Sequence, residues 1–313
     1  MNKPKVLFLL CSYNGEKYIT DQINSILNQI DIEITLLIFD DNSFDNTVLY
    51  AKNIKDPRVT VSVNKYNSGS PALNFIKSIK NLDFSFISKY DYISLCDQDD
   101  IWLPIKTIRA ISLMENNNCD LYASNLTIWD TNTNSKKNTI KKDYQQVEFD
   151  YLFEGASAGC TYVISTKLII NFIKDVMNID FTKWKYLSHD WLFYFYARIT
   201  KQKVIIDSNS YIYYRIHDTN VHGTMNLFSI RAFLKKIKLF YSGWYNIQTL
   251  NYSNYMLNDD NVEKYIYSQY NKNWFSRIGI LILYNRKLFR SKKKFFIFFF
   301  FNLFYFKKYS KNS

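Results

Sequence analysis

Apolar and polar residues alternate in short blocks along the first hundred positions of the chain. Four segments have the composition and spacing of strands, mostly apolar as in strands buried on both faces; they are 5–10, 33–39, 58–63 and 92–96. Three segments between them repeat apolar residues at helical spacing; they are 15–29, 45–54 and 71–82. Asn14 is a candidate N-cap for the first helix. This alternation predicts a Rossmann-like α/β fold, with a mostly parallel sheet flanked by helices.

The pattern continues less regularly beyond residue 100. A helix is expected over 104–117, a strand over 120–129, and a loop or hairpin tip in the polar stretch 130–146. Further helices are expected near 167–177 and over 188–200. Near Gly223 the composition changes, and the chain beyond it is helical in pattern, aromatic and basic. We therefore expect two domains, covering residues 1–223 and 224–313.

Charge divides at the same boundary. The net charge of the 313 residues is +12, yet residues 224–313 hold 16 Lys and Arg against 3 Asp and Glu, while residues 1–223 hold 24 against 25. The back of the chain should favour an anionic partner, either a membrane surface or nucleic acid. Only seven glycines occur, with no G-x-G-x-x-G and no P-loop, which argues against dinucleotide and Walker-type phosphate sites.

The end of the chain contains an aromatic block, 295–306, with Lys and Arg on both sides. Its 12 residues are fewer than the roughly 20 that a spanning helix needs. Cations around an aromatic segment are typical of contact with an anionic bilayer surface, which we favour. One alternative is a C-terminal helical subdomain whose phenylalanines pack on residues 1–223. Another is stacking on nucleic acid, which no recognised binding module supports.

Four cysteines show no C-x-x-C spacing, and most lie in or beside apolar stretches. Free thiols in a reducing cytosol are the expected state.

Polar clusters follow three of the predicted strands, at 11–15, 40–43 and 96–100. In an open parallel sheet, ligands bind beyond the carboxyl ends of the strands. Each cluster alone could be a turn or a helix cap, but three on one edge indicate a binding site. The third places Asp97, Asp99 and Asp100 together, where a divalent cation or a hydrogen-bonding ligand would relieve their repulsion. Oxygen ligands favour Mn²⁺ or Mg²⁺, although Asp100 could simply cap the next helix.

Six motifs occur in an order that resembles family 2 glycosyltransferases of the GT-A fold. They are CSYNG, DDNS, DQDDIWLP, AGCT, HDW and YYRIHDTNVHG, and the resemblance spans residues 4 to about 223. Within the family, the chain is most similar to bacterial rhamnosyltransferase-like enzymes of surface polysaccharide synthesis. The third and last motifs are fairly specific, whereas the first two are common to the whole family.

The resemblance implies roles on the donor side of the site. Cys11, Tyr13 and Asp41 would hold the nucleotide base, and Asp97 would reach the ribose or the sugar. Asp99 would hold the metal beneath the diphosphate.

Further roles follow from the later motifs. Arg215 and His217 would lie on a loop that closes over the diphosphate, with His217 touching the diphosphate or the metal. The segment Gly159, Cys160, Thr161 would line the acceptor side, where His189 would orient the loop. Asp190 matches the general base.

The chemistry asks for the same residue types independently. A leaving diphosphate needs its developing charge neutralised, and an acceptor hydroxyl needs a base to take its proton. One base without a covalent intermediate gives inversion at the anomeric carbon. Asp190 also has a plain structural interpretation, because either Ser188 or Asp190 could cap the helix that follows.

We therefore expect an inverting, metal-dependent glycosyltransferase in cell-surface polysaccharide synthesis. The donor would be dTDP-rhamnose or a UDP-hexose, and the acceptor a glycan or a polyprenyl-linked sugar. The enzyme would be cytoplasmic and peripheral on the inner face of the membrane, without nucleic acid as a partner. The alternatives are a nucleotidyltransferase, for which the first strand lacks a Gly-rich basic loop, and a non-catalytic nucleotide- or membrane-binding protein.

Overall fold

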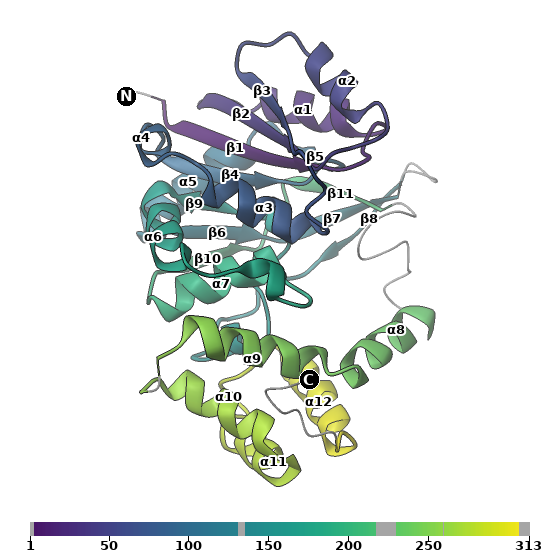
Figure 1. Cartoon of the computed structure of the whole chain (residues 1–313), viewed down its shortest axis with the longest axis vertical. Helices are drawn as coiled ribbons and strands as arrows, with labels where there is room; N and C mark the ends of the chain where they lie inside the picture. The colour runs from purple at the N-terminus through teal and green to yellow at the C-terminus, as the bar shows by residue number, and fades with distance from the viewer. Residues whose placement is uncertain (1–2, 131–134, 217–229, 259, 307–313) are drawn as a thin grey trace. The chain divides into compact units, whose positions relative to one another are not determined.

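A seven-stranded sheet is the centre of the N-terminal part of the chain in the computed structural model (Figure 1). Its spatial order is β10-β6-β9-β4-β1-β2-β3, and β9 alone runs antiparallel to its neighbours. The strands are β1 (Lys5–Ser12), β2 (Glu33–Asp40), β3 (Val59–Val63), β4 (Tyr92–Cys96), β6 (Leu121–Ser124), β9 (Val163–Ser165) and β10 (Val204–Asp207). The predicted α/β class with a mostly parallel sheet is confirmed.

The structure describes residues 3–130, 135–216, 230–258 and 260–306. The chain divides into two units. The first comprises residues 1–143, 155–178 and 188–218, and the second comprises 144–154, 179–187 and 219–313. The second unit thus includes two segments that precede the basic C-terminal region in the sequence.

Helices cover the sheet of the first unit. They are α1 (Ile19–Leu27), α2 (Thr47–Asn53), α3 (Pro71–Lys80), α4 (Phe84–Ile87), α5 (Lys106–Asn117), α6 (Thr166–Val176) and α7 (His189–Ile199). Helix α3 packs against β1 and α7, while α5 packs against β6 and β9. The apolar run of β1, from Val6 to Leu10, is fully buried, as a strand covered on both faces must be.

Four strands form a smaller second sheet in the order β5-β11-β7-β8. They are β5 (Ile101–Trp102), β7 (Leu126–Asp130), β8 (Ser135–Ile140) and β11 (Ile212–Ile216). The prediction of one strand over 120–129 is wrong, because the segment divides between the two sheets at Asn125. The Asn125 side chain donates to the carbonyl of Ser208 at 2.7 Å and so holds the break. In the polar stretch that follows, β8 pairs antiparallel with β7, as in the predicted hairpin.

The first helix begins later than its pattern indicated. Tyr18 precedes α1 without a side-chain cap, so the prediction that Asn14 is the N-cap is wrong. Asn14 instead has a positive φ of 48°, and its side-chain oxygen accepts from Phe44 N at 3.1 Å. Its turn belongs to the polar edge of the sheet.

All four cysteines are free, and Cys11, Cys96 and Cys160 are buried. The expected free thiols are confirmed.

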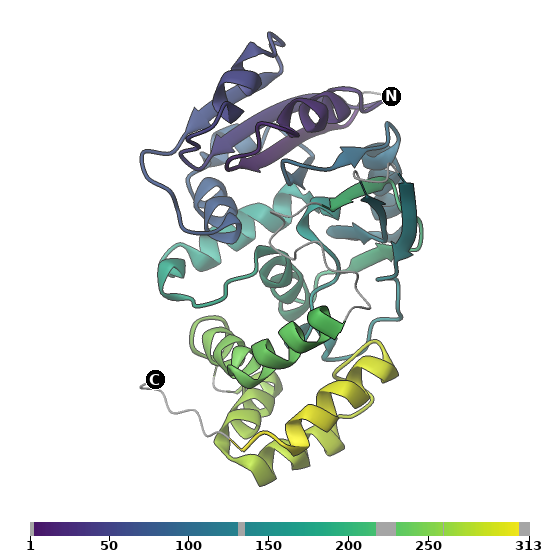
Figure 2. The same ribbon diagram turned by 90° about the vertical axis from the view of Figure 1, so that its right-hand side faces the viewer.

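The described part of the second unit is mainly helical, and its helices run from green to yellow in Figure 2. They are α8 (Ile230–Tyr241), α9 (Trp244–Met256), α10 (Val262–Lys272), α11 (Trp274–Leu283) and α12 (Lys292–Leu303). Two short 3₁₀ helices, Asp150–Leu152 and Phe181–Lys183, come from the inserted segments.

Phe153, on the first inserted segment, lies at the centre of this unit's aromatic core. Its ring centroid is 5.2 Å from that of Tyr270, 5.4 Å from that of Phe298 and 5.9 Å from that of Tyr267. Tyr267 also donates to the carbonyl of Leu152 at 2.7 Å. The aromatic C-terminal helix therefore contributes to a core within this unit.

Buried charges hold the inserted segment to the C-terminal helices. Nε of Arg290 lies 3.2 Å from Glu154 and 3.6 Å from Asp150, and all three side chains are at most 9% exposed. By contrast, Lys287 pairs with Glu148 at 2.7 Å where both side chains are about half exposed.

Helix α12 is apolar on more than one side. Phe295 and Phe298 are buried, whereas Phe296, Ile297 and Phe300 are 66%, 44% and 56% exposed. In the part of the chain that the structure describes, no helix has the length and apolar character to span a bilayer.

Arg290→Met should lower the free energy of unfolding by about 3–5 kcal/mol, because it removes the buried cation beside Asp150 and Glu154 and leaves Glu154 only the partly exposed Lys294, at 3.0 Å. Lys287→Met is the matched control and should cost about 1 kcal/mol or less, since its pair is exposed. Urea unfolding monitored by tryptophan fluorescence measures both. Equal losses in the two variants would show that the buried pairs do not hold this unit together.

Candidate active site

The ends of three neighbouring parallel strands bring the predicted polar clusters to one edge of the sheet. The strands β4, β1 and β2 are adjacent, and Ser12 at the end of β1 is in register with Asp40 at the end of β2. Ser12 Oγ donates to Asp40 Oδ2 at 2.8 Å. Asn14 N donates to Ser43 Oγ at 2.8 Å. These bonds join the first two clusters.

Tyr13 and Gln98 join the first cluster to the third. Tyr13 N donates to Gln98 Oε1 at 2.8 Å, and Gln98 Nε2 donates to the Tyr13 carbonyl at 3.1 Å. A side chain at Gly15 would overlap this amide. Tyr13 is 44% exposed, so a ligand can reach it, whereas Cys11 is 7% exposed. Burial raises the pKa of the Cys11 thiol, which leaves it a neutral packing group.

Asp41 is buried at the end of β2 and its carboxylate accepts three hydrogen bonds. The donors are Asn64 Nδ2 at 2.8 Å, Ser68 N at 2.8 Å and Ser68 Oγ at 2.7 Å. The Asp41 carbonyl also accepts from Asn67 Nδ2 at 2.9 Å. The carboxylate thus orders the loop after β3, and neither Asn64 nor Ser68 was among the predicted site residues.

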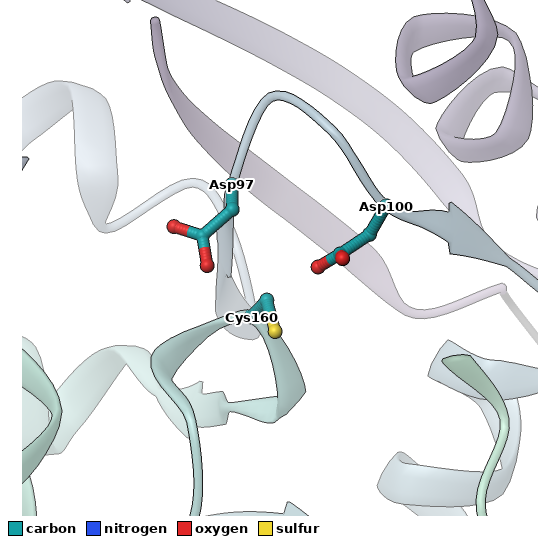
Figure 3. Close-up of side chains that lie close together, drawn as sticks. All are labelled: Asp97, Asp100 and Cys160. Atoms are coloured by element: carbon teal, nitrogen blue, oxygen red, sulfur yellow. The ribbon is translucent and has the colours of Figure 1, made fainter. Parts of the chain in front are cut away.

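Asp97 and Asp100 converge with Cys160, as Figure 3 shows. One ligand atom from each of the three lies within 4.8 Å of the others. Asp100 is fully buried, and its Oδ2 has no hydrogen-bond partner among the described residues. The alternative that Asp100 caps the next helix is wrong, because α5 begins after Ile105 without a side-chain cap. Its buried oxygen is directed to the cluster instead.

The carboxylates resist ionisation in this arrangement. Burial, with the charges of Asp99 and Asp190, raises the pKa of Asp97 to about 7. Burial, with Asp99 and Asp97, raises the pKa of Asp100 well above its usual range. Mutual repulsion in a poorly solvated place is relieved by protons or by a bound cation.

Arg215 holds the acidic loop from β11. Its Nε donates to the Asp99 carbonyl at 2.8 Å and its Nη2 to Asp21 at 3.1 Å, while its backbone N donates to Asp100 Oδ1 at 3.4 Å. The guanidinium also lies 4.6 Å from the Trp129 ring centroid. The side chain is 6% exposed, so these contacts fix the loop. His217, predicted beside the diphosphate, lies outside the described residues.

The start of α7 lies next to this cluster. Ser188 Oγ and Asp190 Oδ1 both accept from Trp191 N, at 3.4 Å and 2.8 Å, and Ser188 Oγ also donates to Asp190. The Asp190 carboxylate therefore takes part in capping, as the plain interpretation expected. The preceding residue, His189, lies against Gly159, the neighbour of Cys160, which places the start of α7 near the cluster.

His189 is held between two elements of the first unit. Its ring stacks on Phe75 with centroids 4.3 Å apart, and its Nε2 is buried without a hydrogen-bond partner among the described residues. Burial lowers the pKa of His189. Gly159 lies against the imidazole. Next to it, Thr161 is buried, with its hydroxyl bonded to the Ala158 carbonyl at 2.8 Å.

Lys106 is a fully buried cation that the sequence did not single out, since a Lys near a helix start is normally solvated. Its Nζ lies 3.3 Å from the centroid of the Trp102 ring. Burial lowers the pKa of Lys106 to about 8, while Cys96, Cys160 and Asp100 oppose that shift. The nearby thiols and Asp100 thus favour the charged form of this lysine, while its burial disfavours it.

The family model for glycosyl transferase family 2 matches residues 8–165, which include the three clusters and most of the sheet. The chain belongs to glycosyl transferase family 2. This membership argues against the nucleotidyltransferase alternative.

Two curated relatives show what this glycosyltransferase resembles. The dTDP-rhamnosyl transferase RfbG of Shigella flexneri is 34% identical over 88% of this chain and 91% of its own length. The UDP-Glc:alpha-D-GlcNAc-diphosphoundecaprenol beta-1,3-glucosyltransferase WfgD of Escherichia coli is 28% identical over 53% of this chain and 62% of its own length.

The fold matches that of a solved structure, S. aureus TarS 1-349 in complex with UDP-GlcNAc. The TM-score is 0.56 at 17% sequence identity, over 85% of this chain and 70% of that chain. This likeness confirms the GT-A fold.

Gly159→Ala should displace the His189 ring, because the new Cβ would overlap it. We expect the free energy of unfolding to fall by about 1–3 kcal/mol. Gly155→Ala is the matched control, since its Cβ would meet Trp191 at an ordinary 3.4 Å. Thermal unfolding compares them. Similar melting temperatures would show that the His189 ring is not confined by Gly159.

Asp97→Asn should flatten the pH dependence of stability in the metal-free protein. The native pKa of Asp97, about 7, lies above the ordinary 3.8, so between these values the native chain binds more protons than the unfolded chain. The contribution of Asp97 is therefore complete below about pH 4 and is lost as the pH rises through about 7. Unfolding by urea from pH 5 to pH 8 should show a smaller loss for Asp97→Asn than for the wild type. An unchanged slope would contradict the raised pKa.

Proposed function

We propose that this family 2 glycosyltransferase transfers a sugar with inversion from a nucleotide donor, with the help of a divalent cation. The observation that carries the proposal is the convergence of Asp97 and Asp100 at the carboxyl edge of the sheet. The exposed Tyr13 and the ordered Asp41 loop lie on the same edge and offer contacts to a nucleotide base. We propose residues 1–223 as the catalytic part of the chain.

The acidic cluster fits a bound cation. Asp100 has a buried carboxylate oxygen without a partner among the described residues, and both Asp97 and Asp100 have raised pKa values. Carboxylate oxygens suit Mn²⁺ or Mg²⁺, whereas the Cys160 thiol is a soft ligand that suits neither. A cation held there would neutralise charge on the leaving diphosphate. Asp97 and Asp100 would hold it, with Asp99 as a further carboxylate and Arg215 fixing the loop.

Asp190 would act as the general base. Its carboxylate would take the proton of the acceptor hydroxyl as that oxygen bonds to the anomeric carbon and the bond from this carbon to the diphosphate breaks. A single displacement of this kind inverts the anomeric configuration. Support comes from the start of α7, where the neighbouring His189 lies against Gly159, next to Cys160 of the acidic cluster. We propose the Gly159–Thr161 segment and His189 for the acceptor side.

We propose dTDP-rhamnose as the donor, because the relative with 34% identity over 88% of this chain carries the name dTDP-rhamnosyl transferase. A UDP-hexose is the second candidate, supported by the glucosyltransferase that matches 53% of the chain. The name of that relative also supports a diphosphate-linked polyprenyl acceptor. Such an acceptor lies in a bilayer, which agrees with a peripheral attachment through the basic residues 224–313 at the inner face of the membrane.

The direct test is release of nucleoside diphosphate from a panel of donors with Mn²⁺ or Mg²⁺ present. dTDP-rhamnose should be hydrolysed fastest, and chelation by EDTA should stop the reaction. Faster turnover of UDP-glucose would make a UDP-hexose the proposed donor. No turnover of any donor, with or without a lipid-linked acceptor, would favour a non-catalytic binding protein.

Asp190→Asn should lower turnover by roughly two to four decades, the usual contribution of a general base, and leave donor binding nearly unchanged. Ser70→Ala is the control for loss of a helix cap. It removes the capping oxygen of α3, which accepts from Leu73 N, and should cost about 1 kcal/mol of stability with turnover retained. Steady-state kinetics and donor titrations separate the two effects. If both variants lose turnover equally, Asp190 acts only as a cap.

Asp100→Asn and Asp99→Asn distinguish two assignments of the metal carboxylate. The family resemblance favours Asp99, whereas the convergence with Asp97 favours Asp100. We expect Asp100→Asn to weaken Mn²⁺-dependent binding of dTDP by at least about tenfold, and Asp99→Asn to weaken it less. Calorimetry with and without Mn²⁺ measures this. The opposite ranking would assign the metal to Asp99.

A further inference from the structure

A pocket of about 740 Å³ lies within the second unit, and none of the residues proposed for catalysis lines it. Val147 on the inserted segment, Ile282 on α11, and Phe296 and Phe299 on α12 supply much of its apolar lining. Phe289 and Phe295 add two more rings. The volume falls in the range of small-molecule sites.

Cations but no carboxylates line this pocket. Arg290 is neutralised by Asp150 and Glu154. Arg286 and Lys292 also line it, both are exposed, and neither has a carboxylate partner among the described residues. The pocket thus combines an apolar interior with two available positive charges.

Helix α12 places one of these charges and two rings on the same side. Lys292, Phe296 and Phe299 are spaced by four and then three residues, which aligns them along one helical face. Phe296 is 66% exposed and Ile282 is 55% exposed, so the apolar lining continues to the surface. Lys293 and Phe300 lie on the same helix and do not line the pocket.

We propose that this pocket binds an anionic phospholipid of the bilayer, with an acyl chain against the phenylalanines and the phosphate against Arg286 and Lys292. Charge complementarity selects an anionic head group, and the apolar lining selects a hydrocarbon chain. The inference rests on the proposed membrane attachment and makes it specific. The protein then attaches to the membrane through a defined lipid site as well as through general electrostatic attraction.

The test uses the full chain and dihexanoylphosphatidylglycerol, a short phospholipid that is monomeric below its critical micelle concentration. Calorimetry should show saturable binding to one site, and little binding of dihexanoylphosphatidylcholine. Lys292→Gln should weaken binding by about fivefold, and Lys293→Gln, with the same change in net charge, should weaken it much less. Phe296→Ser should weaken binding and Phe300→Ser should not. Thermal unfolding verifies that each variant is folded.

Several outcomes would overturn the proposal. One is the absence of saturable binding. Another is an equal loss of lipid affinity in the two variants of each matched pair, which a non-specific electrostatic attraction predicts. Displacement of the lipid by a short oligonucleotide at equal concentration would assign the pocket to nucleic acid instead. Donor hydrolysis by the same wild-type preparation tests the proposed enzyme activity separately from the proposed lipid site. Lipid binding without hydrolysis would contradict the proposed enzyme activity alone, and hydrolysis without lipid binding would contradict the pocket alone.

Discussion

Mutual repulsion of carboxylates at the end of a buried strand is the constraint on which the site depends. Asp97, Asp99 and Asp100 follow β4 within four positions, and Asp190 acts on Asp97 from another element. Asp100 is fully buried and the carboxyls of Asp97 and Asp99 are partly buried, so water screens this repulsion less than at a protein surface. The fold keeps the group together with fixed contacts: Arg215 bonds to the loop backbone, and Lys106 is buried behind it. Protonation relieves the repulsion within such a group, and we propose that a bound cation can take the place of the protons.

The second unit is stabilised by a different set of contacts. Its core is built from aromatic rings around Phe153, and the arginines buried with them bond to carboxylates or to backbone carbonyls. Arg277, for example, is fully buried and donates to the carbonyls of Tyr270 and Tyr305. With those cations used internally, the charge available to a partner comes from exposed residues such as Arg286 and Lys292. The large positive charge of residues 224–313 is therefore only partly available to a membrane.

Periodicity sufficed for the parallel part of the sheet, because strands buried on both faces leave long apolar runs such as that of β1. Periodicity could not predict the break between β6 and β7 at Asn125, where a side-chain hydrogen bond takes the place of backbone pairing between strands. The polar clusters were predictable because parallel strands end on one edge. The contacts between the clusters were not predictable from the sequence. Pairing of Gln98 with Tyr13, the bonds of Asp41 to Ser68 and the burial of Lys106 depend on the tertiary approach of distant segments, which local pattern does not encode.

The central claim is that this acidic cluster exchanges protons for a divalent cation. Thermal unfolding of the wild-type protein with increasing Mn²⁺, at pH 8 and at pH 5.5, tests it most directly. The account predicts that Mn²⁺ raises the melting temperature at pH 8, as a ligand of the native state must. The effect should be much smaller at pH 5.5, where Asp97, with its pKa near 7, holds a proton. No effect of Mn²⁺ at pH 8, or an equal effect at both pH values, would contradict the account.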